Sequence, residues 1–237
     1  MRGALVALAL AVAGCATSQA YVAPEEATHL QRELTGQRFF LAASMYVTPF
    51  FGDATRALLT PWPPDEVRLL ESPDGSPIAP GPVERIVPVG ARAQVERLEF
   101  PSPTTMAERM LYTPRSLIWV FVKVSGAEVG PRPLVLVLRP GLRSASEVRS
   151  ELERSLTLQD PGPRLQGWSE AVREAIRAKK AIPDMTAEAL EMAWGLPERK
   201  RIELVGPERR ETWSWPGTRS ALLVDGRVTA LLGEPGR

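Results

Sequence analysis

The sequence is poor in cysteine, histidine and aromatic residues. Cys15 and His29 are the single members of their types among 237 residues, and aromatic side chains account for 6% of the chain. One cysteine cannot close an internal disulfide, and one cysteine with one histidine cannot provide the ligands of a zinc site. We expect His29 to lie in a solvated tether, which disfavours a catalytic triad built on it.

Excess charge and catalytic motifs are also lacking. Lys and Arg number 29 against 28 for Asp and Glu, so the formal net charge is +1. This balance disfavours nucleic acid as a partner, because binding to phosphates needs an excess of cations. No P-loop, Gly-x-Ser-x-Gly or Ser-x-x-Lys motif is present. We therefore predict that the protein is not an enzyme and uses no cofactor and no metal; a carboxylate pair assembled by folding remains open as an alternative.

Long apolar runs are missing after the first residues, whereas proline is abundant. Residues 134–138 form only a short apolar run, far below the roughly 20 residues that a membrane-spanning helix needs. The 23 prolines are about twice the usual proportion of roughly 5%. Because proline breaks helices, this composition disfavours a long all-helical bundle.

The first fifteen residues have the features of a secretory signal. Arg2 precedes an uncharged run of small and aliphatic residues, which ends in Val12-Ala13-Gly14-Cys15. This ending resembles the lipobox of bacterial lipoproteins, in which small residues precede an acylated cysteine. The resemblance implies that Val12, Ala13 and Gly14 are recognised by the signal peptidase and that Cys15 carries the lipid. A buried free thiol is the alternative interpretation of Cys15.

Such a lipid would tether the protein to a membrane without spanning it. Two or three acyl chains give a stable anchor, whereas a single chain gives a marginal one. Residues 16 and 17 are Ala and Thr, so the aspartate that retains lipoproteins at the inner membrane is absent. We expect the periplasmic face of an outer membrane, with the inner membrane and the cell surface as alternatives.

We divide the chain into a signal peptide (1–14), a lipid-anchored tether (15–37) and two domains. Residues 38–157 are expected to be β-rich, a small barrel or sandwich closed by a helix, because apolar and polar residues alternate over 91–100. The closing helix should begin at Ser144, which has the capping-box spacing to Glu147.

The second domain, residues 168–233, is expected to contain two helices and a three-stranded antiparallel sheet. Ser169 and Thr186 are suitable helix caps, and Asp225-Gly226 between apolar runs is a strong hairpin signal. The whole chain is therefore predicted to have an α+β fold.

Part of the second domain resembles the SmpA/OmlA type of outer-membrane lipoprotein. The resemblance covers about residues 183–228 and rests on Met185-Thr186, Trp194-Gly195-Leu196-Pro197, Trp213-Ser214-Trp215 and the apolar hairpin at 222–228. Asp184 departs from the family's glycine, and Trp194 from its usual leucine. The resemblance implies two helices against a three-stranded antiparallel sheet and a role beside the machinery that inserts β-barrel proteins.

Trp213 and Trp215 alternate on one expected strand and therefore face the same side. Core packing is the favoured interpretation of this pair, and a partner surface is the alternative. For the protein as a whole we expect a non-enzymatic envelope lipoprotein, a scaffold or binding protein for a protein partner. A cell-wall module is the second hypothesis, because residues 90–95 resemble the start of a bacterial SH3-like barrel. A carboxylate-dependent hydrolase is the third.

Overall fold

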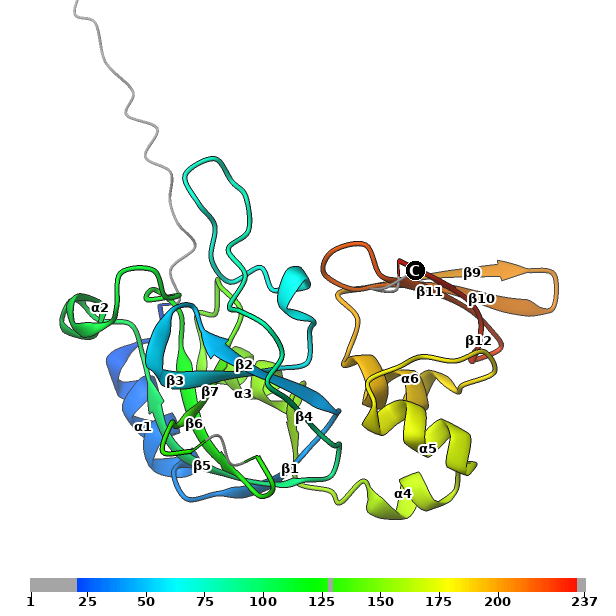
Figure 1. Cartoon of the computed structure of the whole chain (residues 1–237), viewed down its shortest axis with the longest axis horizontal. Helices are drawn as coiled ribbons and strands as arrows, with labels where there is room; N and C mark the ends of the chain where they lie inside the picture. Colours follow the sequence, from blue (N-terminus) through cyan, green and yellow to red (C-terminus); the bar gives the residue numbers. More distant parts are fainter. Residues whose placement is uncertain (1–20, 128–129, 234–237) are drawn as a thin grey trace, which may run out of the picture.

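The computed structural model describes residues 21–127 and 130–233 and shows a mixed α+β protein, which confirms the predicted fold class. Two sheets organise the chain, one in each of two units that follow each other in the sequence (Figure 1). The first unit contains eight strands and the second contains four.

The helices and strands have the following bounds. The helices are α1 Pro24–Leu34, α2 Pro103–Glu108, α3 Ala145–Glu153, α4 Gly162–Gln166, α5 Glu170–Arg177 and α6 Ala187–Trp194, with a 3₁₀ helix, η1, at Pro64–Glu66. The strands of the first unit are β1 Arg38–Leu41, β2 Met45–Phe50, β3 Asp53–Thr60, β4 Arg85–Val87, β5 Arg92–Glu99, β6 Trp119–Val124, β7 Leu134–Val137 and β8 Leu156–Thr157. Those of the second unit are β9 Arg199–Val205, β10 Glu208–Ser214, β11 Ser220–Val224 and β12 Arg227–Leu232.

The first sheet is open, with the strand order β4-β2-β3-β7-β6-β5-β1-β8. All its neighbouring strands are antiparallel except β3 and β7, which are parallel. Within the described residues its edge strands β4 and β8 do not pair with each other, so the sheet does not close. The barrel or sandwich expected for residues 38–157 therefore takes the form of a single sheet with both faces partly covered.

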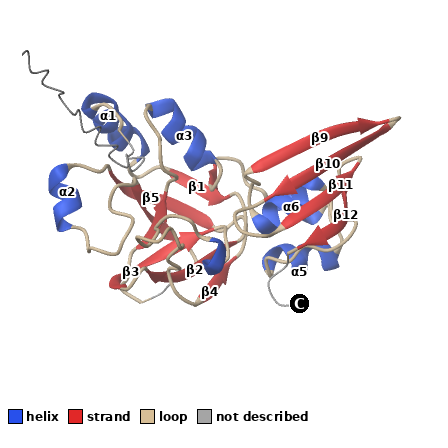
Figure 2. Ribbon diagram, turned by 90° about the horizontal axis from the view of Figure 1, so that it is seen from above, coloured by secondary structure: helices blue, strands red, loops and turns tan. Residues whose placement is uncertain are grey.

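Strand β6 shows how the two faces of this sheet are used. Val120 and Val122 pack into the larger core, with α1 and α3, whereas Trp119 and Phe121 pack into a second cluster on the opposite face. Figure 2 shows α1 and α3 side by side against the sheet. A strand buried on both faces reads as a continuous apolar run, as residues 117–122 do.

Helix α1 corrects the expectation of a tether over residues 15–37. Leu30 and Leu34 of α1 are buried in the core of the first unit. Arg149 of α3 forms an ion pair with Glu33, with 2.5 Å between Nη2 and Oε2. Residues 24–34 are thus part of the folded unit, because one face of this polar helix is apolar enough to pack on the sheet.

The second unit has the two helices and antiparallel sheet that the sequence predicts, but four strands rather than three. The hydroxyls of Ser169 and Thr186 accept hydrogen bonds from the first turns of α5 and α6, as expected of caps. Strand β9 pairs with β10 along its whole length, and the sheet order is β12-β11-β10-β9. Tryptophan side chains dominate the core beneath, where Trp194 packs edge-on against Trp215 at 5.0 Å between ring centroids.

The two units meet through buried polar contacts as well as apolar ones. Met192 of α6 accepts a hydrogen bond from the backbone N–H of Ser44, at 2.8 Å. Gly195 ends α6 with φ of 82°, and a Cβ at this position would lie 2.8 Å from Pro61 Cβ. Only glycine suits both this backbone conformation and this close approach.

Candidate functional site

The first unit carries a groove whose polar side chains come from three neighbouring strands. Arg38 on β1 is paired with Gln94 on β5, and Gln94 is paired in turn with Lys123 on β6. Directly opposed residues of antiparallel strands face the same side of a sheet. Arg38, Gln94 and Lys123 therefore form one row across the sheet, and a spacing of roughly 4.8 Å between strands separates the two cations by about 10 Å.

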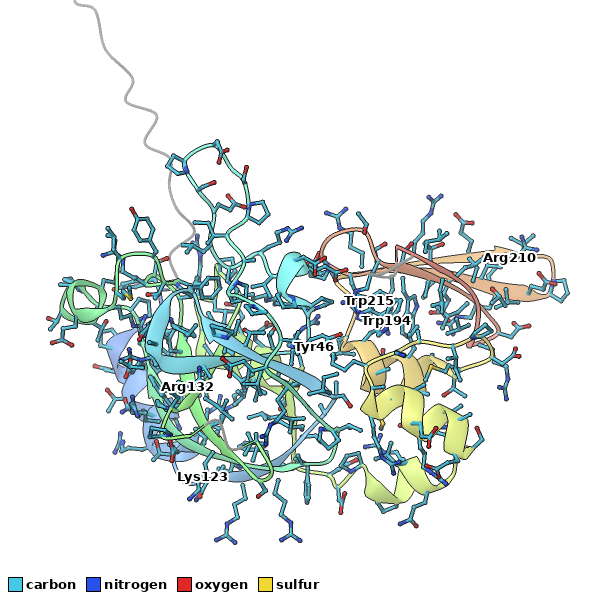
Figure 3. All side chains as sticks on the ribbon, viewed as in Figure 1. Tyr46, Lys123, Arg132, Trp194, Arg210 and Trp215 are labelled. Carbon is cyan, nitrogen blue, oxygen red and sulfur yellow. The ribbon has the colours of Figure 1, made fainter. Side chains whose placement is uncertain are left out.

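A second row, of Phe40 and Arg92, lies two residues further along the same strands. The groove has a volume of about 950 Å³. Its lining is Arg38, Phe39, Phe40, Arg92, Ala93, Gln94, Glu96, Val122, Lys123, Val124, Ser125, Gly126, Ala127, Gly130, Pro131, Arg132, Pro133 and Leu134. Figure 3 shows Lys123 and Arg132 on the first unit, well away from the contact between Trp194 and Trp215.

The groove is electropositive. Among the described residues that line the groove, Glu96 is the single carboxylate, against four cations. Arg132 is paired with Glu84, at 2.5 Å between Nη2 and Oε2, and this hydrogen bond lowers the pKa of Glu84. The other three cations, Arg38, Arg92 and Lys123, are exposed and form no ion pair within the part of the chain that the structure describes.

The spacing of these cations determines which ligands suit the groove. A single small anion contacts cations that converge within a few ångströms, whereas these are spread over about 10 Å of sheet. An extended peptide that bears several carboxylates can contact cations separated by this distance. Gln94 is held in place by donating from Nε2 to the carbonyl of Gly36 at 3.0 Å, and Phe40 adds apolar contact area. The arrangement suits binding of an acidic segment.

The most perturbed titratable group lies elsewhere, between the two units. Lys179 is buried, and its Nζ donates to the carbonyl oxygens of Ser44 and of Ala193, the latter at 2.8 Å. Burial, with a smaller contribution from the charge of Arg219, holds the pKa of Lys179 well below its usual value. Because both hydrogen bonds go to backbone carbonyls, the geometry indicates a structural contact that joins Ser44, just before β2, to α6.

A buried ion pair lies near this lysine. Arg219 donates from Nε to both carboxylate oxygens of Glu66, at 2.8 and 2.7 Å. Burial raises the pKa of Glu66, and the charge of Arg219 opposes this shift. Buried charges require partners of this kind, so the pair serves the packing of the two units.

A second cavity, of about 30 Å³, lies where the units meet. This volume has room for about one or two water molecules. Glu151 is its single acidic lining residue, and burial raises the pKa of that carboxyl. Among the described residues, one carboxylate lines each of these two cavities, Glu96 in the groove and Glu151 here.

The structure describes only some of the predicted site residues. Val12, Ala13, Gly14 and Cys15 lie outside the described residues. His29 is exposed on α1, with Nε2 at 3.6 Å from Glu33 Oε2.

The structure corrects the alternative interpretation of Trp213 and Trp215 as a partner surface. Both side chains are buried in the core of the second unit. Trp213 Nε1 donates to Glu211 at 2.9 Å, and Trp215 Nε1 donates to the carbonyl of Gly195 at 2.9 Å. Neither tryptophan offers a face to a partner.

The groove is not apparent from the sequence alone. The alternation of Arg92, Gln94 and Glu96 was visible in the sequence and predicted a half-exposed strand. This alternation does not predict the strand pairing that places Arg38 and Lys123 on either side of Gln94. That pairing joins segments far apart in the chain and is fixed by the long-range register of the sheet.

Comparison with known proteins finds no matching family model, no matching curated protein and no matching solved structure. Within residues 21–127 and 130–233, no helix combines the length and apolar character needed to cross a bilayer. The same residues contain no cluster of three or more His, Cys, Asp or Glu side chains suited to a metal ion.

Proposed function

We propose that this protein is a non-enzymatic bacterial envelope lipoprotein that binds a protein partner. Lipid on Cys15 holds it at the periplasmic face of the outer membrane. The groove around Arg38, Arg92 and Lys123 binds an extended acidic segment of that partner, and the complex serves envelope assembly or maintenance. The lipid anchor and the protein partner are its proposed contacts, with no role for nucleic acid or a metal.

The unpaired cations of the groove carry this proposal. Arg132, the fourth cation of the groove, is paired with Glu84. Arg38, Arg92 and Lys123 lie on one face of the sheet and form no ion pair among the described residues, so they leave a positive potential that attracts an acidic partner. The groove is also long enough for several residues of an extended segment, because it crosses β1, β5 and β6.

The second unit supports the envelope role through its architecture. The SmpA/OmlA resemblance over residues 183–228 implies two helices against a three-stranded antiparallel sheet, and the second unit has two such helices against four antiparallel strands. Members of that family accompany the insertion of β-barrel proteins, so a component of that process is the proposed partner.

The anchor is tested in cells with Cys15→Ser. We expect the native chain to incorporate a fatty-acid analogue and to sediment with outer membranes. The Cys15→Ser chain should lose the label and appear in the soluble periplasmic fraction. A Ser18→Ala chain, changed just after the lipobox, is the matched control and should behave as the native chain does. Label and membrane association that persist in Cys15→Ser would contradict the anchor.

A cell-wall module is the second candidate, and the same groove favours it. Strand β5, which begins at Arg92 in the segment compared with SH3-like barrels, lines the groove. Peptidoglycan peptides also carry carboxylates that cations could bind. Sedimentation with purified cell wall separates the two candidates: binding that Lys123→Glu abolishes would favour the cell-wall module, and absence of binding would favour the protein partner.

A further inference from the structure

The sheet of the second unit has an edge strand, β9, with which no other described strand pairs on its outer side. All seven residues of β9 are exposed. Figure 2 shows β9 and β10 extending as a ribbon beyond α5 and α6. An edge of this kind presents a row of free N–H and C=O groups that can pair with another strand.

The strand also exposes apolar side chains that its own unit leaves uncovered. Ile202 is 51% exposed and Leu204 is 78% exposed. Both face the side of the sheet occupied by the buried residues Glu211 and Trp213, because Ile202 is paired with Glu211. The helices on this side of the sheet leave Ile202 and Leu204 exposed, so these two side chains form an apolar patch beside the free edge.

We propose that β9 pairs antiparallel with β9 of a second copy of this chain, about a two-fold axis through Ile202. In this register each Ile202 lies opposite its counterpart, and each Lys200 lies opposite Leu204 of the other copy. The strands overlap along all seven residues. Backbone hydrogen bonds between the two β9 strands would then pair the free N–H and C=O groups of both copies. The two four-stranded sheets would join into one continuous sheet.

The charges on β9 favour a second copy of this chain as the partner that pairs with the strand. The register places Arg201 opposite Glu203 of the second copy and Glu203 opposite Arg201 of the second copy. Within one chain these two side chains already form an ion pair, at 2.7 Å between Nη2 and Oε1. Pairing therefore creates a network of four alternating charges, and opposite charges on facing strands stabilise a sheet.

Neighbouring registers lose this complementarity. A two-fold axis perpendicular to the sheet must pass through a residue that pairs with its own counterpart. With the axis at Arg201, two arginines lie opposite each other, and with the axis at Glu203, two glutamates do so. Like charges directly opposed destabilise a sheet. Ile202 is thus the centre that gives the longest overlap without a like-charge pair.

The first test uses charge exchange in the full chain carrying Cys15→Ser, studied by sedimentation equilibrium. We expect this chain to dimerise, and Arg201→Glu or Glu203→Arg to weaken dimerisation at least tenfold, since each places like charges opposite each other twice. An equimolar mixture of the two variants should dimerise, because each then supplies what the other lacks. The double variant Arg201→Glu/Glu203→Arg should also dimerise. Lys180→Glu, an equal change of charge away from β9, is the control and should leave dimerisation unchanged.

The second test fixes the register with a thiol. In the Cys15→Ser chain, Ile202→Cys carries a single sulfhydryl, and two copies in the proposed register place these sulfhydryls opposite each other, within reach of a disulfide. We expect rapid formation of a disulfide-linked dimer on mild oxidation. Leu222→Cys, on β11 and away from the edge, should form no disulfide-linked dimer. A monomer at all accessible concentrations, or dimerisation that neither charge variant alters, would overturn the proposal.

Discussion

Arg219 joins the two units by donating from Nε to both carboxylate oxygens of Glu66, across 153 positions of sequence. Glu66 ends η1 in the first unit, and Arg219 immediately precedes β11 in the second. Gly217 allows this approach, because a Cβ there would lie 2.7 Å from Glu66 Cγ. The ion pair is almost completely excluded from solvent, so each charge depends on the other.

Replacing Arg219 with methionine should destabilise the protein strongly. The change leaves Glu66 buried without its partner, and removal of one member of a buried pair costs about 3–5 kcal/mol. We expect the double variant Glu66→Leu/Arg219→Met to be more stable than Arg219→Met alone. Denaturant unfolding measures both, with the exposed Arg227→Met as a control that should have little effect. Equal stability of Arg219→Met and Arg227→Met would contradict the role assigned to the pair.

Lys179 should make the stability rise with pH. Burial lowers its pKa in the folded state, whereas the unfolded chain retains a value near 10.5. Between these two pKa values the unfolded state binds more protons, so the free energy of unfolding increases with pH. We expect Lys179→Met to remove this increase at pH values below 10.5, where the unfolded lysine is still protonated. Parallel pH profiles for the two proteins would contradict the assignment.

Trp213 should behave as a core residue. Trp213→Ala removes a large, fully buried side chain, for which the expected cost is about 3–5 kcal/mol. Leu222→Ala, on the exposed face of the same sheet, should cost less than about 1 kcal/mol. Thermal unfolding monitored by circular dichroism compares the two variants. A Trp213→Ala chain as stable as Leu222→Ala would show that the tryptophan contributes little to packing.

The groove should bind acidic peptides with a marked dependence on salt. We expect a glutamate-rich peptide to bind the native chain more tightly than Lys123→Glu, by about tenfold or more, because the variant reverses a charge in the row with Arg38. Raising the ionic strength should weaken binding to the native chain. Lys180→Glu provides the control with the same change of charge. Fluorescence anisotropy measures the affinity of all three proteins for the peptide. Equal affinities would contradict the binding role proposed for the groove.

Local signals in the sequence predicted local structure well. The caps at Ser144, Ser169 and Thr186 start helices as expected. Asp225 and Gly226 have positive φ in the β11–β12 hairpin. Each of these features depends on residues within one turn or one hairpin, so the α+β class could be predicted from them.

Features that depend on distant segments could not be predicted in this way. Helix α1 is polar in composition, and its role in the core appears only once Leu30 and Leu34 meet the sheet. The Glu66–Arg219 pair and the row of Arg38 and Lys123 depend on sheet register and on the contact between units. Neither leaves a periodic pattern in the sequence.

In the proposed function, the groove of an anchored lipoprotein holds a protein partner. The most direct test of this binding is a photoreactive amino acid placed at Gln94, between the cations of the groove, in the lipidated chain in living cells. We expect ultraviolet light to crosslink this position to a specific envelope protein, and the same substitution at Leu158, an exposed residue outside the groove, to capture none of it. Identical products from both positions, or crosslinks from Gln94 to peptidoglycan alone, would contradict the account.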